Sequence, residues 1–75
     1  GPWPSPKKHN IFAVRSNNQK LIYNDTPETW EFYDLENDPN ELDNIYDKTS
    51  SDIISKFQQR LLFYLKENNI QTKIS

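Results

Sequence analysis

Residues 30–45, WEFYDLENDPNELDNI, are the stretch of this chain that says most about its fold. The stretch opens with bulky aromatic and apolar side chains, which favour a β-strand, and continues into an acidic polar run. Pro39 lies inside that run. Because proline lacks an N–H and fixes φ, it suits the first position of a turn or of a short helix. We therefore predict a strand over residues 30–35 and a turn over residues 36–40.

A short helical turn is predicted directly after Pro39. Asp38 can accept a hydrogen bond from a backbone N–H one or two residues further on. Glu41 follows Asp38 by three residues, which is the spacing of a capping box with Asp in place of the usual Ser or Thr. We expect Leu42 and Ile45 to dock this turn onto the body of the domain.

Two further strands precede this stretch. Residues 10–16 and 20–23 carry clustered apolar side chains, and Asn17-Asn18 between them tolerates the positive φ of a tight turn. Residues 25–28 include a proline, break the apolar pattern and are interpreted as a loop.

The predicted strands carry apolar side chains on both faces. In the first strand, Phe12 and Val14 oppose Ile11 and Ala13. A sheet with one face in water is expected to alternate apolar with polar residues instead. Two interpretations stay open: the second face packs on another domain or another copy of the chain, or a small domain simply exposes some apolar surface.

The last predicted element is a helix. Apolar residues recur with the helical period at positions 53, 54, 57, 61, 62 and 65. Ser50 or Ser51 can cap its N-terminus, Asp52 favours the positive end of its dipole, and Asn68-Asn69 is a suitable stop. The predicted fold class is therefore α+β, with a small antiparallel sheet of three to four strands packed against one C-terminal helix.

The length of 75 residues leaves room for one small domain. We expect residues 1–9 to be a tag remnant followed by a proline-rich arm, residues 10–69 to form the α+β subdomain, and residues 70–75 to be a tail. The absence of cysteine excludes a disulfide framework, a thiolate zinc site and a cysteine nucleophile.

Charge and hydropathy limit the classes of binding partner that the chain can have. Nine basic and eleven acidic side chains give a formal charge of −2, which argues against binding to nucleic acid. No apolar run approaches the roughly 20 residues of a bilayer span, so no membrane partner is predicted. The sequence gives no indication of a compartment.

The titratable residues offer little for chemistry. His9 stands alone beside two lysines and has no neighbouring Asp or Cys ligand, so we interpret it as solvated. An acidic cluster contains no glycine and lacks the spacing of a calcium loop. We interpret its carboxylates as turn caps and as partners of Arg15 or Lys20; they belong to Asp34, Glu36, Asp38 and Glu41.

The order of these motifs resembles the C-terminal subdomain of sulfatases of the alkaline-phosphatase superfamily. Val14-Arg15, then Lys20-Leu21-Ile22-Tyr23, then Phe32-Tyr33-Asp34-Leu35, Asp38-Pro39, Glu41 and Asn44 follow its pattern. Phe32 stands where Leu is usual, Asn40 where Gly is common, and Ile45 where Leu is common. The resemblance covers roughly residues 11–65. The structural motif that it implies consists of Trp30, Tyr33, Asp34, Leu35, Asp38, Pro39, Glu41 and Asn44.

The resemblance implies a subdomain without catalytic machinery. It would complete the fold and flank the substrate cleft of a separate catalytic sulfatase domain, its partner. That domain would cleave sulfate esters with formylglycine and a calcium ion held outside this segment. Since no Cys/Ser-x-Pro/Ala-x-Arg motif occurs here, we predict no catalytic residue, no metal ligand and no cofactor in this chain. The alternative is an autonomous module that self-associates or binds an anionic glycan.

Arg15 and Lys20 are the candidate substrate contacts. In a sulfatase they could reach a sulfated sugar, because the planar fork of a guanidinium matches sulfate oxygens. The interpretation that we favour pairs them with Asp34 or Glu31 across the sheet. Trp30 and Tyr33 could likewise stack on a sugar ring, but we favour a role in the core.

Overall fold

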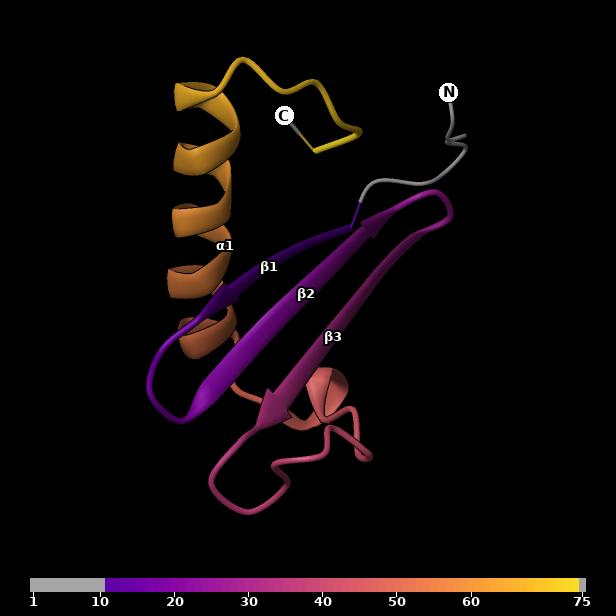
Figure 1. Ribbon diagram of the computed structural model, residues 1–75, viewed down its shortest axis with the longest axis vertical. Coiled ribbons are helices and arrows are strands. Elements are labelled where there is room, and N and C mark those ends of the chain that lie inside the picture. Colours follow the sequence, from indigo (N-terminus) through magenta and orange to yellow (C-terminus); the bar gives the residue numbers. More distant parts are fainter. Residues whose placement is uncertain (1–10, 75) are drawn as a thin grey trace, which may run out of the picture.

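The computed structural model describes residues 11–74. Three strands form one antiparallel sheet in the order β1-β2-β3, and a C-terminal helix packs on one face of it (Figure 1). This arrangement confirms the predicted α+β fold. The proline-rich arm and His9 lie outside the described residues. The elements are β1 (Ile11–Arg15), β2 (Gln19–Asp25), β3 (Glu28–Asp34), the 3₁₀ helix η1 (Tyr46–Lys48) and α1 (Ser51–Glu67).

The strand register places the core on one face of the sheet. Leu21 of the central strand lies opposite Val14 on one side and Phe32 on the other. Because side chains alternate along a strand, these residues point to the same face, which α1 covers. The rings of Phe32 and Phe57 meet edge to face, with centroids 5.1 Å apart. The buried core consists of Leu21, Tyr23, Phe32, Ile54, Phe57, Leu61 and Leu65, with Tyr33 buried on the opposite face.

The turn between β2 and β3 is shorter than predicted. Residues 25–28 were expected to form a loop, but Asp25 and Glu28 are paired in the ladder, and only Thr26-Pro27 forms the turn, with a cis bond before the proline. The prediction was wrong because polar side chains at the end of a hairpin point into water while the backbone still pairs. Asp25 is also held by the Tyr23 hydroxyl, which donates to its carboxylate at 2.9 Å.

Helix α1 begins and ends at local signals. The Ser50 side chain accepts a bond from the Ile53 amide at 3.4 Å, which confirms Ser50 as the N-cap. After the C-cap residue Asn68, Asn69 has a left-handed φ of 55°. The amide of Ile70 then donates to the Leu65 carbonyl at 2.9 Å, completing a Schellman motif. The predicted stop is confirmed.

The residues after the helix fold back onto the core. Ile70 and Ile74 are half-buried and pack against the cluster of Tyr23, Leu61 and Leu65. The backbone amide of Lys73 donates to the Asp25 carboxylate at 3.0 Å. Residues 70–74 therefore cover one end of the core.

The second face of the sheet keeps the mixed character that the sequence predicted. Ile11 and Ala13 are exposed and Ile22 is half-buried, whereas Tyr33 on the same face is buried. Apolar side chains are also exposed along α1, the largest being Phe63 at 65%. Coverage of the second face by another domain stays a prediction.

Candidate functional site

The outer edge of β3 is closed by the segment that joins β3 to α1 and returns to the sheet (Figure 1). The amide of Phe32 donates to the side-chain oxygen of Asn44 at 3.0 Å, and the side-chain amide of Asn44 donates to the Trp30 carbonyl at 3.3 Å. The amide of Ile45 donates to the Phe32 carbonyl at 2.9 Å. A sheet edge otherwise presents such groups unpaired. The Asn44 side chain therefore makes hydrogen bonds with the edge of β3 that a neighbouring strand would otherwise make.

Asp38 shapes the turn before Asn44. Its carboxylate accepts bonds from the amides of Leu42 at 2.9 Å and Asp43 at 3.0 Å. The predicted capping box is wrong, because Glu41 has a φ of 57° and a left-handed residue cannot continue a helix. The chain instead returns to the edge of β3, where Asn44 is bound.

Only one of the two predicted docking residues docks. Leu42 is 83% exposed, which contradicts the prediction that it packs onto the body. Ile45 packs against the cluster formed by Leu21, Phe32, Ile54 and Phe57, as predicted. The backbone takes a left-handed conformation at Glu41, directly before Leu42, which interrupts the helical turn that would have docked the Leu42 side chain.

Asp34 caps its own turn. Its carboxylate accepts from the amide of Glu36 at 3.1 Å and from the side-chain amide of Asn37 at 2.8 Å. The Asn37 side chain is the main reason that the pKa of Asp34 lies below its usual value. The interpretation of the acidic cluster as turn caps is thus confirmed at Asp34 and Asp38.

A shallow acidic pocket of about 320 Å³ lies over this turn. Two of its carboxylates, those of Asp34 and Asp38, accept bonds from amides of the same segment. Within residues 11–74, no three His, Cys, Asp or Glu side chains gather in a way that could hold a metal ion. The lining residues are Asp34, Asn37, Asp38, Asp43 and Ile45.

Lys20 forms an ion pair with Glu41. Its ammonium lies 3.0 Å from a Glu41 carboxylate oxygen, and the two side chains are only 23% and 30% exposed. A partner in the acidic cluster was predicted, but a partner at Asp34 or Glu31 was wrong. Asp34 points to the opposite face of the sheet, and the Glu31 carboxylate already accepts from Asn24 at 3.1 Å and from the Tyr33 hydroxyl.

Arg15 lies directly opposite Lys20 in the register of β1 and β2, so the structure brings the two candidate cations together. Like charges in this position repel, and Glu41 offsets one of them. Arg15 is exposed, and its Nε donates to the Ser16 carbonyl at 3.3 Å. Among the described residues it has no carboxylate partner. Its guanidinium is therefore the freer of the two cations.

The aromatic candidates belong to the packed body, as predicted. Trp30 lies between Tyr23, with ring centroids 4.5 Å apart, and Tyr46, stacked at 5.9 Å. The hydroxyl of Tyr33 donates to the Glu31 carboxylate. That bond, followed by burial, raises the pKa of Tyr33 to about 12.

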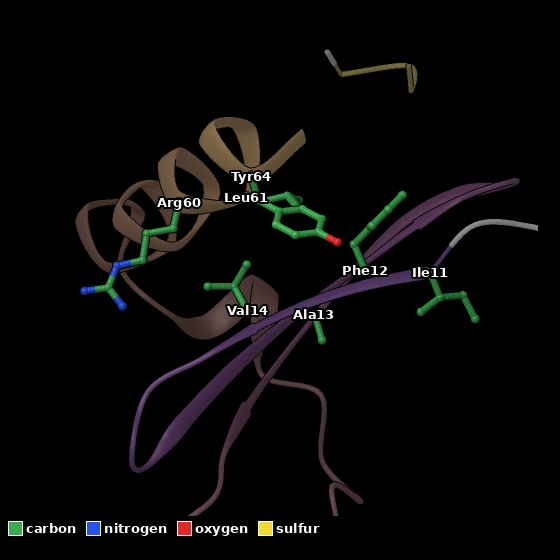
Figure 2. A pocket seen from close by; sticks show the side chains of 7 residues that line it. All are labelled: Ile11, Phe12, Ala13, Val14, Arg60, Leu61 and Tyr64. Atoms are coloured by element: carbon green, nitrogen blue, oxygen red, sulfur yellow. The ribbon is translucent and has the colours of Figure 1, made fainter. Parts of the chain in front are cut away.

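A groove of about 440 Å³ between β1 and α1 was not predicted (Figure 2). Phe12 and Val14 point from β1 toward α1, whereas Ile11 and Ala13 point away from it (Figure 2). The one available signal was the spacing of Arg60 and Tyr64, which places both on one flank of the helix. The lining residues are Ile11, Phe12, Ala13, Val14, Arg60, Leu61 and Tyr64.

Comparison with known protein families decides how this architecture is classified. The sequence model of one family, described as N-sulphoglucosamine sulphohydrolase, C-terminal, matches residues 3–68. The chain belongs to this family. The sulphohydrolase C-terminal family covers all five elements and the Schellman cap residue Asn68, and the resemblance to a sulfatase C-terminal subdomain is confirmed.

One curated relative of this sulphohydrolase C-terminal segment is an N-acetylglucosamine-6-O-sulfatase of Bacteroides thetaiotaomicron. The two are 37% identical over 73 residues, which cover 91% of this chain and 12% of the relative. The chain therefore spans about an eighth of the length of that sulfatase. No solved structure matches the chain. Between residues 11 and 74, no helix has the length and hydropathy needed to cross a membrane.

Proposed function

We propose that this chain is the non-catalytic C-terminal subdomain of a sulfatase, and that it completes the fold and flanks the substrate cleft of a catalytic domain that cleaves sulfate esters. The observation that carries the proposal is how the motif residues are used. Asp38 and Asn44 bind backbone groups of their own segment and of β3, and Glu41 binds Lys20. A group that performs acid or base catalysis must instead face a substrate.

The comparison with known sulfatases supports the same assignment. The chain matches only 12% of a sulfatase that is about eight times longer, and the matching family is a C-terminal one. Nucleophile and metal would then come from the rest of the enzyme. The calcium ion that the resemblance implies would be held by residues outside this segment.

We propose Arg15 as the residue that flanks the cleft. Lys20 is held by Glu41, whereas the guanidinium beside it is exposed and has no carboxylate partner among residues 11–74. A guanidinium binds sulfate oxygens through two parallel N–H groups, which an ammonium cannot reproduce. We therefore assign a contact with the anionic substrate to Arg15 and a supporting role to Lys20.

Two measurements test the proposal. The purified chain is incubated with an aryl sulfate and is expected to give no turnover; turnover above the blank would overturn the non-catalytic role. In the complete enzyme, Arg15→Ala is expected to raise KM for a sulfated sugar more than it lowers kcat, while Arg15→Lys recovers part of the loss. Lys56→Ala on the outer face of α1 is the matched control, and an equal effect at both positions would contradict the assignment of Arg15.

Self-association is a second candidate function. The exposed apolar side chains of Ile11 and Phe63, 58% and 65% exposed, favour it. Sedimentation of the chain over a concentration series distinguishes the two functions. A monomer at every concentration would argue against self-association. A dimer formed by the isolated chain, without any catalytic domain, would favour it.

A further inference from the structure

We infer that the open edge of β1 docks an extended segment from the catalytic part of the enzyme, in a β-strand addition that also fills the groove between β1 and α1. The inference rests on the proposed function and names the contact through which the subdomain would be attached.

The backbone register shows which groups face the open edge. The amide of Ser16 donates to the Gln19 carbonyl at 2.9 Å, and the amide of Leu35 donates to the Asn18 carbonyl at 2.9 Å. In antiparallel pairs, residues that bond to one neighbour alternate with residues that face the other side. Since Ser16 bonds inward, the N–H and C=O groups of Ile11, Ala13 and Arg15 point away from β2.

The two edges of the sheet are treated differently. The outer edge of β3 is closed by Asn44 and Ile45. The outer edge of β1 has no strand or loop paired with it within residues 11–74. Open edges pair readily with other strands, and natural proteins usually cover or blunt them. The edge of β1 carries a charge only at Arg15, its end, and has no proline between Ile11 and that residue.

The groove beside this edge supplies side-chain specificity. A strand added to β1 would place every second side chain on the face that carries Phe12 and Val14, and therefore toward Leu61 and Tyr64 of α1 (Figure 2). Those walls are apolar. Arg60 stands at the margin of the groove and forms no ion pair with a carboxylate in the described part of the chain. The groove thus fits a segment with alternating apolar residues and one Asp or Glu beside Arg60.

The length of the sulfatase relative favours the catalytic part as the occupant over a second copy. The chain matches 12% of that protein, so a sulfatase of this size contains about seven times as much chain outside the subdomain. A subdomain on the flank of the catalytic domain needs a contact with it, and an edge with an adjoining apolar groove offers both backbone bonds and burial.

Hydrogen exchange at single-residue resolution tests this contact. In the isolated chain, the amides of Ile11, Ala13 and Arg15 are expected to exchange fast, while those of Phe12 and Val14 are protected by β2 and report that the chain is folded. In the complete enzyme, the three outward amides should exchange at least about tenfold more slowly. Equal rates in the chain and in the enzyme would overturn the inference.

Ala13→Pro gives a second, independent test in the complete enzyme. It removes an outward N–H and fixes φ at residue 13, a change that an edge strand tolerates, whereas Ala13→Val keeps that N–H and suits a strand. The proline variant is expected to split thermal unfolding into two transitions, and the valine variant to unfold in one. One unchanged transition for both variants would overturn the inference; should the proline chain fail to fold alone, the exchange rates decide.

The outcomes separate this inference from the proposed function. Protection of the β1 edge in an enzyme that does not cleave sulfate esters would support the contact and contradict the function. An enzyme that cleaves sulfate esters but leaves the amides of the β1 edge unprotected would support the function and contradict the contact. Protection of the same amides in the isolated chain, together with a dimer in sedimentation, would replace the catalytic part by a second copy and overturn the inference.

Discussion

The side-chain oxygen of Asn44 lies 3.0 Å from the backbone nitrogen of Phe32, twelve residues earlier in the chain. The same side chain donates to the carbonyl of Trp30 at 3.3 Å, so a single amide serves as acceptor and donor at the edge of β3. Leucine or alanine could offer neither function, and aspartate only the first. Asn44, the last residue of the motif that resembles the sulfatase subdomain, thus closes the outer edge of β3.

Replacing Asn44 should therefore destabilise the fold. Asn44→Ala leaves the partly buried amide of Phe32 without its acceptor, at an expected cost of about 1–3 kcal/mol in the free energy of unfolding. Asn44→Asp keeps an acceptor and should cost less. Urea unfolding measures both, with the exposed Asp43→Ala as the control. An Asn44→Ala variant as stable as the control would refute this role.

The ion pair of Lys20 with Glu41 should show a small but measurable coupling energy. A double-mutant cycle with Lys20→Met and Glu41→Gln is expected to give about 0.2–1 kcal/mol, because both side chains are mostly shielded from water yet still near the surface. The same cycle with Arg15→Met is the matched control and should give a coupling near zero. Stronger coupling of Glu41 to Arg15 than to Lys20 would contradict the observed pairing.

Replacing Asn69 by glycine should stabilise the fold. Its φ of 55° is left-handed, where glycine has no steric penalty and alanine costs roughly 1–2 kcal/mol relative to a right-handed residue. Asn69→Gly is expected to raise the Tm by a few degrees and Asn69→Ala to lower it. Glu67→Gly, within the last turn of α1, should lower the Tm and serves as the control. The idea fails if glycine lowers the Tm at both positions.

Acid should weaken the fold through Asp25. The amide of Lys73 and then the hydroxyl of Tyr23 hold the pKa of this carboxyl below its usual value of 3.8. A carboxyl whose pKa is lower in the folded state stabilises that state above its unfolded pKa, and this contribution is lost as the pH falls through the folded pKa. The urea concentration at the midpoint of unfolding should therefore decrease as the pH is lowered below about 4. In the Asp25→Asn variant, the urea midpoint should decrease less steeply with falling pH. Identical pH profiles for the variant and the unmodified chain would exclude this carboxyl as a source of the acid sensitivity.

Alkali should act through Tyr33. The carboxylate of Glu31 accepts its hydroxyl proton and raises the pKa of Tyr33 to about 12, above the usual value of 10.0. A raised phenol pKa stabilises the fold below the unfolded value, and this contribution is lost as the pH rises through the folded one. Ultraviolet difference spectra should show Tyr33 ionising late, and Glu31→Gln should make it ionise earlier. Ionisation at the usual pH in the unmodified chain would rule out this effect.

Local signals explain what the sequence predicted well. The apolar period at positions 53, 54, 57, 61, 62 and 65 placed α1, and Ser50 and Asn68-Asn69 marked its ends. Of these six residues, Ile54, Phe57, Leu61 and Leu65 are buried, whereas Ile53 is half-buried and Leu62 is exposed. These features depend on residues within a few positions of one another, where backbone preference and capping act directly. The family resemblance was available from the same stretch because its motif residues follow one another in a fixed order.

Contacts between residues that are far apart in the sequence could not be predicted from local signals. Lys20 and Glu41 are 21 residues apart, and no periodicity selects one carboxylate of an acidic cluster over another. The exposure of Leu42 depends on the left-handed φ of Glu41. The groove beside β1 required the placement of α1 over the sheet.

The sequence by itself determined the three strands, the C-terminal helix, their order and the apolar stripe of that helix, because these follow from side-chain period and from capping within one turn. Only the tertiary structure decided that Asn44 closes the β3 edge while the β1 edge stays open, and that Glu41 takes Lys20 and leaves Arg15 unpaired within residues 11–74. Those outcomes depend on which groups meet in space once the hydrophobic face of the sheet has been covered, and a linear pattern does not contain that information.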